Sequence, residues 1–97
     1  MQSAALETVN QPVTELTLIP GVLHIGRNKD NDIVLTEPGV SDYHAKIITY
    51  FHQSILVDLS SEAGCYLNGK HVIKHTIKSG DMVKLGEHCF KIRLRSF

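Results

Sequence analysis

The sequence has no tryptophan, only two cysteines and three prolines, and no excess of either charge among its 97 residues. Ten Lys and Arg residues balance ten Asp and Glu residues, and the basic residues form no run. Nucleic-acid binding depends on clustered Lys and Arg that neutralise phosphates, so this balance argues against a nucleic-acid partner. Hydrophobic residues make up 42% of the chain, which is typical of a packed globular protein and not of a disordered tail. We therefore expect any function to reside in a local patch of the surface.

Long apolar segments are also missing from the sequence. No run approaches the roughly 18–20 residues that span a bilayer, and the N-terminus lacks the basic and apolar regions of a secretory signal. Cys65 and Cys89 are too few for a disulfide framework, so we expect reduced thiols. These absences, with a length close to the commonest domain size of about 100–150 residues, predict a single cytoplasmic domain.

The pattern along the chain is that of short strands. Residues 1–12 show neither alternation nor a capped helical stripe, and we interpret them as a flexible lead-in or linker before a domain over residues 13–97. From residue 13, extended runs alternate with turn signals about every 8–12 residues, which predicts an all-β sandwich or barrel. The runs predicted as strands are 13–18, 22–25, 33–35, 45–51, 54–59, 66–67, 72–73, 82–85 and 89–94. Loops at one end of such a sandwich are the expected place for a binding site.

Several short motifs occur in a specific order along these predicted strands and turns. They are Gly26-Arg27, Ser41-Asp42-Tyr43-His44, Asp58-Leu59-Ser60-Ser61-Glu62-Ala63-Gly64, Asn68-Gly69, Gly80-Asp81 and Leu85-Gly86. Each is uninformative alone, but their order and intervals over roughly residues 13–95 resemble the forkhead-associated (FHA) domain family. The resemblance implies a two-sheet β-sandwich of about eleven strands. It also implies loops at one end that bind phosphothreonine peptides, without a cofactor.

The resemblance points to particular site residues. The expected phosphopeptide-binding residues are Arg27, Ser41, Asp42, Glu62 and Ala63. The planar guanidinium of Arg27 can donate two parallel bonds to a phosphate, and Ser41 can add its hydroxyl and an exposed backbone N–H. Positions expected to support the site are Gly26, His44, Gly64, Asn68 and Gly69, with His44 as a buried brace between the recognition loops.

Three of these positions depart from the family pattern. Asp42 stands where the family commonly has Arg, Lys or Asn, and Glu62 stands where it often has Thr or another small polar residue. Ala63 replaces the usual Asn that bonds the peptide backbone. A carboxylate about 4 Å from another unit charge interacts by roughly 4 kcal/mol at an effective dielectric of 20, enough to offset most of what Arg27 contributes.

Two functions therefore remain open from the sequence. The first is a phosphothreonine-peptide-binding module in signalling, whose partner is a phosphorylated protein or peptide. The second is an FHA-like scaffold, for example of a bacterial secretion or regulatory protein, that binds a protein partner without phosphate. Exposed Arg27 and Ser41 with Asp42 turned away would favour the first function, whereas Arg27 paired with Asp42 or Glu62 would favour the second.

Catalytic and metal sites are not predicted. His71 and His75 have the i, i+4 spacing of a zinc-binding helix, but they follow a turn in a β-branched stretch. In a strand they would share a face without a third ligand. Ser41 and His44 lack an acid that would orient the histidine as a base. We expect a non-enzymatic binding module, not itself inserted in a membrane, that forms part of a longer protein.

Overall fold

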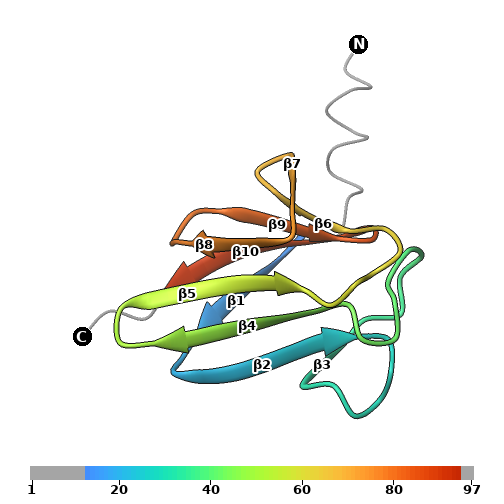
Figure 1. Ribbon diagram of the computed structural model, residues 1–97, viewed down its shortest axis with the longest axis horizontal. Coiled ribbons are helices and arrows are strands. Elements are labelled where there is room, and N and C mark those ends of the chain that lie inside the picture. The colour runs from blue at the N-terminus through green and yellow to red at the C-terminus, as the bar shows by residue number, and fades with distance from the viewer. Residues whose placement is uncertain (1–12, 95–97) are drawn as a thin grey trace.

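The computed structural model describes residues 13–94, and within that range every regular element is a β-strand (Figure 1). The ten strands are β1 (Val13–Leu18), β2 (Gly21–Gly26), β3 (Ile33–Val34), β4 (Ala45–Tyr50), β5 (Gln53–Asp58), β6 (Cys65–Leu67), β7 (Lys70–Val72), β8 (Lys74–Ile77), β9 (Met82–Leu85) and β10 (His88–Leu94). The predicted all-β class is confirmed, with ten strands in the described residues against about eleven expected. The proposed lead-in, residues 1–12, lies outside the described residues.

The strands form two sheets of five, in the orders β1-β10-β9-β6-β7 and β3-β2-β4-β5-β8. Most neighbours are antiparallel, but β1 pairs with β10 in parallel and β2 pairs with β3 in parallel. Because β1 lies beside β10 along its whole length, the first and last described strands fasten each other at one edge of their sheet. The second sheet carries β2, β4 and β5, whose ends support the loops described below (Figure 1).

The two sheets enclose a core of alternating apolar side chains. In β10, Phe90 and Ile92 are buried while Lys91 and Arg93 between and after them are exposed, as expected for a strand with one face inward. Fully buried aliphatic side chains of the opposite sheet include Ile47 and Leu56. Each such side chain stabilises the fold by about 1.5–3 kcal/mol relative to an exposed position.

Local turn chemistry explains how the strands are joined. Asn68 and Gly69 between β6 and β7 have φ values of 50° and 87°, so both central residues adopt the positive φ of a type I′ turn. The hairpin between β4 and β5 turns at Phe51 and His52, one residue earlier than the sequence predicted. Phe51 adopts a φ of 53° there and is largely exposed.

One prediction about strands is wrong. We expected His71 and His75 to share one strand face, but the chain bends at Ile73 between β7 and β8. His71 therefore lies in β7 of the first sheet, and His75 lies in β8 of the second. Sequence alternation missed β8 because the exposed run Lys74-His75-Thr76 ends in a single buried residue, Ile77.

Two further expectations concern composition. Cys65 and Cys89 are free thiols, as predicted, and Cys65 is buried. Burial raises the pKa of the Cys65 thiol well above its usual range, so this side chain is protonated and unreactive at neutral pH. Across residues 13–94, no helix could cross a bilayer.

Candidate functional site

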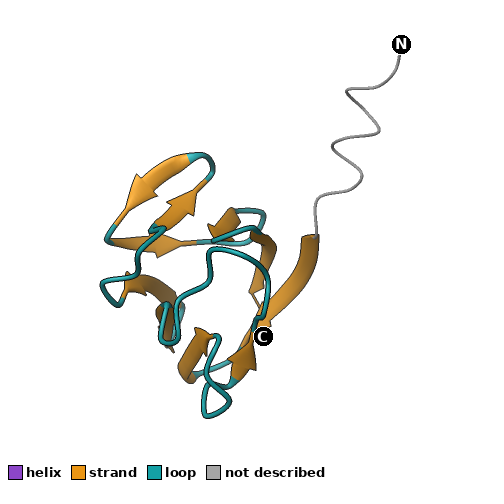
Figure 2. Cartoon of the chain, turned by 90° about the vertical axis from the view of Figure 1, so that its right-hand side faces the viewer, coloured by secondary structure: helices purple, strands orange, loops and turns teal. Residues whose placement is uncertain are grey.

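Three loops meet at one end of the sandwich, which faces the viewer in Figure 2. They are residues 27–32 after β2, residues 35–44 before β4, and residues 59–64 after β5. Backbone hydrogen bonds join the first two loops, because Arg27 N–H donates to the Ser41 carbonyl at 2.9 Å and Asn28 N–H donates to the Asp42 carbonyl at 3.1 Å. The third loop joins through Leu59 N–H, which donates to the His44 carbonyl at 2.9 Å. The loops thus form one connected surface.

Arg27 lies at the start of the first loop with an exposed side chain. Its Nε–H donates to the Val40 carbonyl at 3.3 Å, and its Nη2 group donates to the Glu37 carbonyl at 2.9 Å. Within residues 13–94, no carboxylate forms an ion pair with this guanidinium. The Nη1 group and the second hydrogen of Nη2 remain available to an anion, and the side chain is already ordered by two carbonyls.

Ser41 is half-buried on the neighbouring loop. Its Oγ accepts a hydrogen bond from the Glu62 N–H at 3.1 Å, which leaves the hydroxyl hydrogen free to donate. The expectation of an exposed Ser41 backbone N–H is wrong, because this N–H donates to Nδ1 of His44 at 3.1 Å. The hydroxyl is therefore the group that Ser41 can offer to a ligand.

His44 is completely buried and connects two of the loops. Its Nδ1 accepts from Ser41 N–H, so the ring proton must be on Nε2, which donates to the Gly64 carbonyl at 2.8 Å. The neutral Nε2–H tautomer is the form that satisfies both partners. A doubly protonated ring would place a donor against the Ser41 N–H.

Two glycines allow the loops to approach this closely. A Cβ on Gly26 would lie 2.2 Å from the Asp42 carbonyl oxygen, so a side chain there would force the first two loops apart. Gly64 has a φ of +85°, and a Cβ on it would lie 2.7 Å from Nε2 of His71 on β7. Gly64, at the end of the 59–64 loop, therefore lies next to the rings of both His44 and His71.

Two of these loops, 35–44 and 59–64, border an open hollow of about 330 Å³. It is lined by Gly39, Val40, Ser41, Glu62 and Ala63. Arg27 does not line the hollow, but its guanidinium donates to the carbonyl of Val40, which is one of the lining residues.

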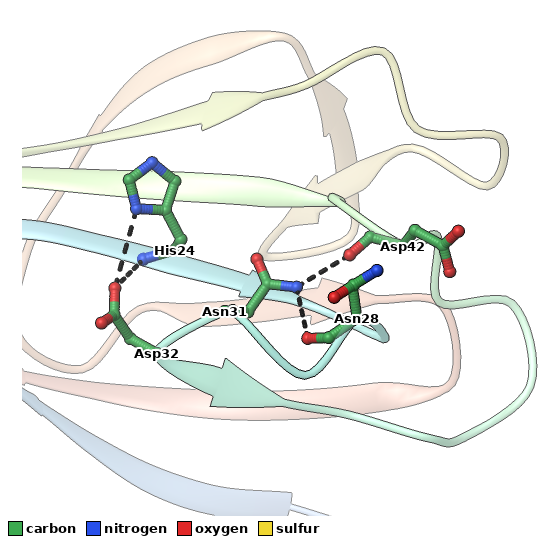
Figure 3. A network of polar contacts seen from close by, with 5 residues as sticks. All are labelled: His24, Asn28, Asn31, Asp32 and Asp42. Carbon is green, nitrogen blue, oxygen red and sulfur yellow. Dashed lines mark hydrogen bonds and ion pairs between the residues drawn. The ribbon is translucent and has the colours of Figure 1, made fainter.

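The two unexpected acids are both exposed. Asp42 uses its backbone carbonyl to accept from Asn28 and Asn31, while its carboxylate points away from those residues (Figure 3). Glu62 contributes its backbone N–H to Ser41, and its side chain borders the hollow. Neither carboxylate pairs with Arg27 in the part of the chain that is described.

Asn68 and Gly69 are not brought to the hollow. The Asn68 side chain donates to Asp81 at 3.0 Å and accepts from Met82 N–H at 2.9 Å, so it ties the β6–β7 turn to the start of β9. These bonds stabilise the sandwich at a different place from the hollow.

Asn31 is a residue of the site that none of the sequence motifs includes. This buried side chain donates to the Asn28 carbonyl at 2.9 Å and to the Asp42 carbonyl at 2.8 Å, as Figure 3 shows. It therefore closes the 27–32 turn onto the Ser41–His44 segment. A signal for this role is present in the sequence Asn28-Lys29-Asp30-Asn31-Asp32, because Asn and Asp side chains in a turn bond to nearby backbone groups.

A cluster of metal-ligand residue types lies beneath the 59–64 loop. Ligand atoms of His44, Asp58 and Cys65 lie within 4.8 Å of one another. Within the cluster the Cys65 thiol donates to Asp58 at 3.4 Å, and Nε2 of His44 donates to the Gly64 carbonyl outside it. A metal would have to displace the His44 bond and deprotonate a thiol whose pKa burial raises, so these residues fit a bracing role better than a metal centre.

A two-sheet β-sandwich with a cationic and hydroxyl-bearing surface on the loops at one end defines a class of peptide-binding interaction modules. The sequence model of the FHA domain family matches residues 23–86. The chain belongs to the FHA domain family, whose domains are interaction modules.

Similar proteins carry such a domain within longer chains. The Saccharomyces cerevisiae DNA damage response protein kinase DUN1 is 29% identical over 107 residues, covering 82% of this chain and 21% of the kinase. A structure from a structural and functional analysis of phosphothreonine-dependent FHA domain interactions superposes with a TM-score of 0.78 at 30% identity, covering 82% of this chain and 83% of that chain. Mycobacterium tuberculosis EmbR in complex with a low-affinity phosphopeptide gives 0.73 at 30% identity, covering 82% of this chain and 22% of that chain. This chain thus spans about a fifth of DUN1.

Proposed function

We propose that this chain binds phosphothreonine peptides through Arg27 and the Ser41 hydroxyl and acts as an interaction module in signalling. The observation that carries the proposal is the state of Arg27, whose guanidinium contacts two backbone carbonyls and no carboxylate within residues 13–94. A charged donor that is ordered and not neutralised is suited to a dianionic ligand. The phosphothreonine-dependent interactions and the phosphopeptide complex of two similar structures support the same ligand class.

The magnitudes favour binding of moderate strength. Each charge-assisted hydrogen bond to phosphate contributes about 1.5–3 kcal/mol. An acid about 8 Å from a dianionic phosphate costs roughly 4 kcal/mol at an effective dielectric of 20 but only about 1 kcal/mol when water separates the charges, and salt screens it further. Asp42 and Glu62 are both exposed, so their repulsion reduces the contribution of Arg27 without cancelling it. We expect dissociation constants in the micromolar range.

The scaffold function is supported by a different observation. Glu62 and Ala63 border the hollow with an acid and a methyl group, and neither offers a side-chain donor to a phosphopeptide. A module that binds its partner without phosphate would not need the free Arg27 guanidinium, and this is why we place phosphate-dependent binding first.

We also propose that the chain acts in the cytoplasm, as part of a longer protein. A phosphothreonine ligand requires a compartment that contains protein kinases, and two free thiols suit the reducing cytoplasm. The module would act beside other domains, as it does in relatives that are much longer than this chain.

A peptide titration tests the proposal. A degenerate peptide library with a fixed central phosphothreonine, and its unphosphorylated counterpart, would be titrated while backbone amide shifts are followed. We expect shifts at residues 27–28 and 40–42 with the phosphorylated library alone. Equal shifts with both libraries would favour the scaffold function, and no shifts at these residues would contradict the proposed site.

A further inference from the structure

The loop that holds the Arg27 guanidinium is fastened to the turn between β9 and β10. Nδ1 of His88 lies 2.6 Å from the Glu37 carboxylate, and Nε2 of the same ring lies 2.9 Å from the Thr14 hydroxyl on β1. Next to this pair, Glu87 N–H donates to the Pro38 carbonyl at 3.1 Å. His88 is buried, whereas the Glu37 side chain is about 30% exposed.

Two glycines make this fastening tight. A Cβ on Gly86 would lie 2.6 Å from the carbonyl carbon of Gly39, and a Cβ on Gly39 would lie 3.1 Å from Cα of Gly86. The 37–40 segment and the β9–β10 turn are therefore in backbone contact. Because two backbones in contact cannot shift independently, the position of the Glu37 and Val40 carbonyls is set by the sandwich itself.

Glu37 connects His88 to Arg27, because its side chain bonds to one and its backbone to the other. Its carboxylate is bound by His88, and its backbone carbonyl accepts from Nη2 of Arg27 at 2.9 Å. The Val40 carbonyl, three residues further along, accepts from Nε of Arg27. A fixed 37–40 segment thus fixes both acceptors that orient the guanidinium.

The bond between His88 and Glu37 also occupies a carboxylate that belongs to one of the residues Arg27 contacts. Glu37 is the acid whose own backbone carbonyl holds Arg27, and the pKa of its carboxyl is lowered mainly by the hydrogen bond from His88 and to a smaller extent by the charge of Arg27. The bond to His88 turns that charge toward β10. We propose that His88 and Glu37 are positioning residues, which hold Arg27 in its ligand-ready orientation and keep the Glu37 carboxylate from pairing with it; this inference rests on the proposed phosphopeptide function.

The proposal predicts a specific order among variants. Glu37→Ala removes the carboxylate and the bond to His88 but keeps the carbonyl, so we expect affinity for the best phosphothreonine peptide of the library to fall about threefold, from reordering one flexible side chain. His88→Phe leaves the carboxylate free to pair with Arg27, so we expect a larger loss of about tenfold. The double variant should return to the level of Glu37→Ala alone. His88→Gln, which keeps an N–H donor, should recover most of the affinity.

Side-chain NMR of the free protein provides a measurement that does not depend on peptide binding. The Nε–H signal of Arg27 should exchange slowly with water in the wild-type protein, faster in Glu37→Ala, and slowly again in His88→Gln. The matched control is Glu15→Ala, which removes an exposed acid on β1 that pairs with Arg93 on β10 at 2.8 Å and forms no bond with His88 or Glu37. It should leave both the Arg27 signal and the peptide affinity unchanged.

The outcomes separate this proposal from the proposed function. An Arg27 signal and an affinity that stay at wild-type values in folded Glu37→Ala and His88→Phe proteins would overturn the positioning role, while phosphopeptide binding would stand. If His88→Phe loses affinity and adding Glu37→Ala does not restore it, the proposal that His88 keeps the Glu37 carboxylate away from Arg27 is overturned. If the wild-type protein binds no phosphopeptide, the proposed function fails, and the exchange of the Arg27 Nε–H still tests the positioning. If His88→Phe does not fold, Glu37→Ala and His88→Gln carry the test, because the first changes a partly exposed loop residue and the second keeps a donor.

Discussion

Two buried histidines support the site, one on the side of Ser41 and the other on the side of Arg27, but in different ways. His44 bonds only to backbone groups, the N–H of Ser41 and the carbonyl of Gly64. His88 bonds to two side chains, the carboxylate of Glu37 and the hydroxyl of Thr14. Backbone partners exist whatever residues occupy those positions, whereas side-chain partners require particular residues far apart in the sequence. The Ser41 side is therefore held by backbone groups of the loops themselves, and the Arg27 side is completed by side chains from β1 and β10.

The largest expected effect comes from removing the backbone brace. His44→Ala would leave the Ser41 N–H and the Gly64 carbonyl without partners and would open a cavity, which together destabilise the fold by about 3–5 kcal/mol. Urea denaturation of the variant and of His75→Ala, an exposed histidine on β8, would measure the difference. A loss below about 1 kcal/mol for His44→Ala would contradict the bracing role.

The next effect acts on binding and not on stability. Arg27→Ala removes the proposed phosphate donor, so we expect the phosphothreonine peptide to bind at least about a hundredfold more weakly, equivalent to roughly 3 kcal/mol. The melting temperature should change little because the side chain is exposed. Calorimetric titration of this variant beside Arg93→Ala gives the comparison, and equal affinities for the two variants would exclude Arg27 from the site.

A smaller effect is expected from restoring a polar group on the Ser41 side. Ala63→Asn would supply an amide at the rim of the hollow, where it could bond a peptide backbone, and we expect binding to tighten about fivefold, or roughly 1 kcal/mol. Ala63→Asp has nearly the same size but adds a negative charge, so it should weaken binding. Fluorescence anisotropy with the same phosphopeptide distinguishes the two, and identical affinities would show that residue 63 does not face the ligand.

The smallest effect is a pH dependence on the Arg27 side. The hydrogen bond from His88 holds the pKa of Glu37 below its ordinary value of 4.5, so Glu37 contributes stability above that pH. The contribution is lost as the pH falls through the lowered pKa of the folded state, and partial exposure limits it to below about 1 kcal/mol. Urea denaturation between pH 7 and 3 should therefore give a steeper loss for the wild-type protein than for Glu37→Ala. Parallel curves would show that the pair contributes nothing to stability.

Local features of the site could be predicted from the sequence, whereas contacts between distant residues could not. The turn at Asn68-Gly69 and the strands other than β8 follow from turn chemistry and alternation, which are local signals, whereas the burial of His44 follows from the resemblance to the family. We expected the Ser41 N–H to be exposed, but it donates to the ring of His44, three residues away. Glu37 and His88 are 51 residues apart, and no pattern along the chain indicates that they touch.

The directions of the acids could not be predicted for a related reason. Asp42 and Glu62 lie within the motifs, but their side chains face solvent while their backbone groups make the loop contacts. Residue identity alone suggested a conflict of charge with Arg27. The folded chain satisfies Arg27 with carbonyls, and this solution depends on the path of the 37–40 segment.

The most direct test of the account follows the Arg27 side chain itself during a peptide titration. The Nε and Nη signals of Arg27 would be recorded in the wild-type protein as the phosphothreonine peptide, and then its unphosphorylated counterpart, is added. We predict that these signals shift and saturate with the phosphorylated peptide alone, together with the amide of Ser41. Arg27 signals that remain unchanged while the peptide binds elsewhere would contradict the central claim that the ordered, unpaired guanidinium is the phosphate-binding group.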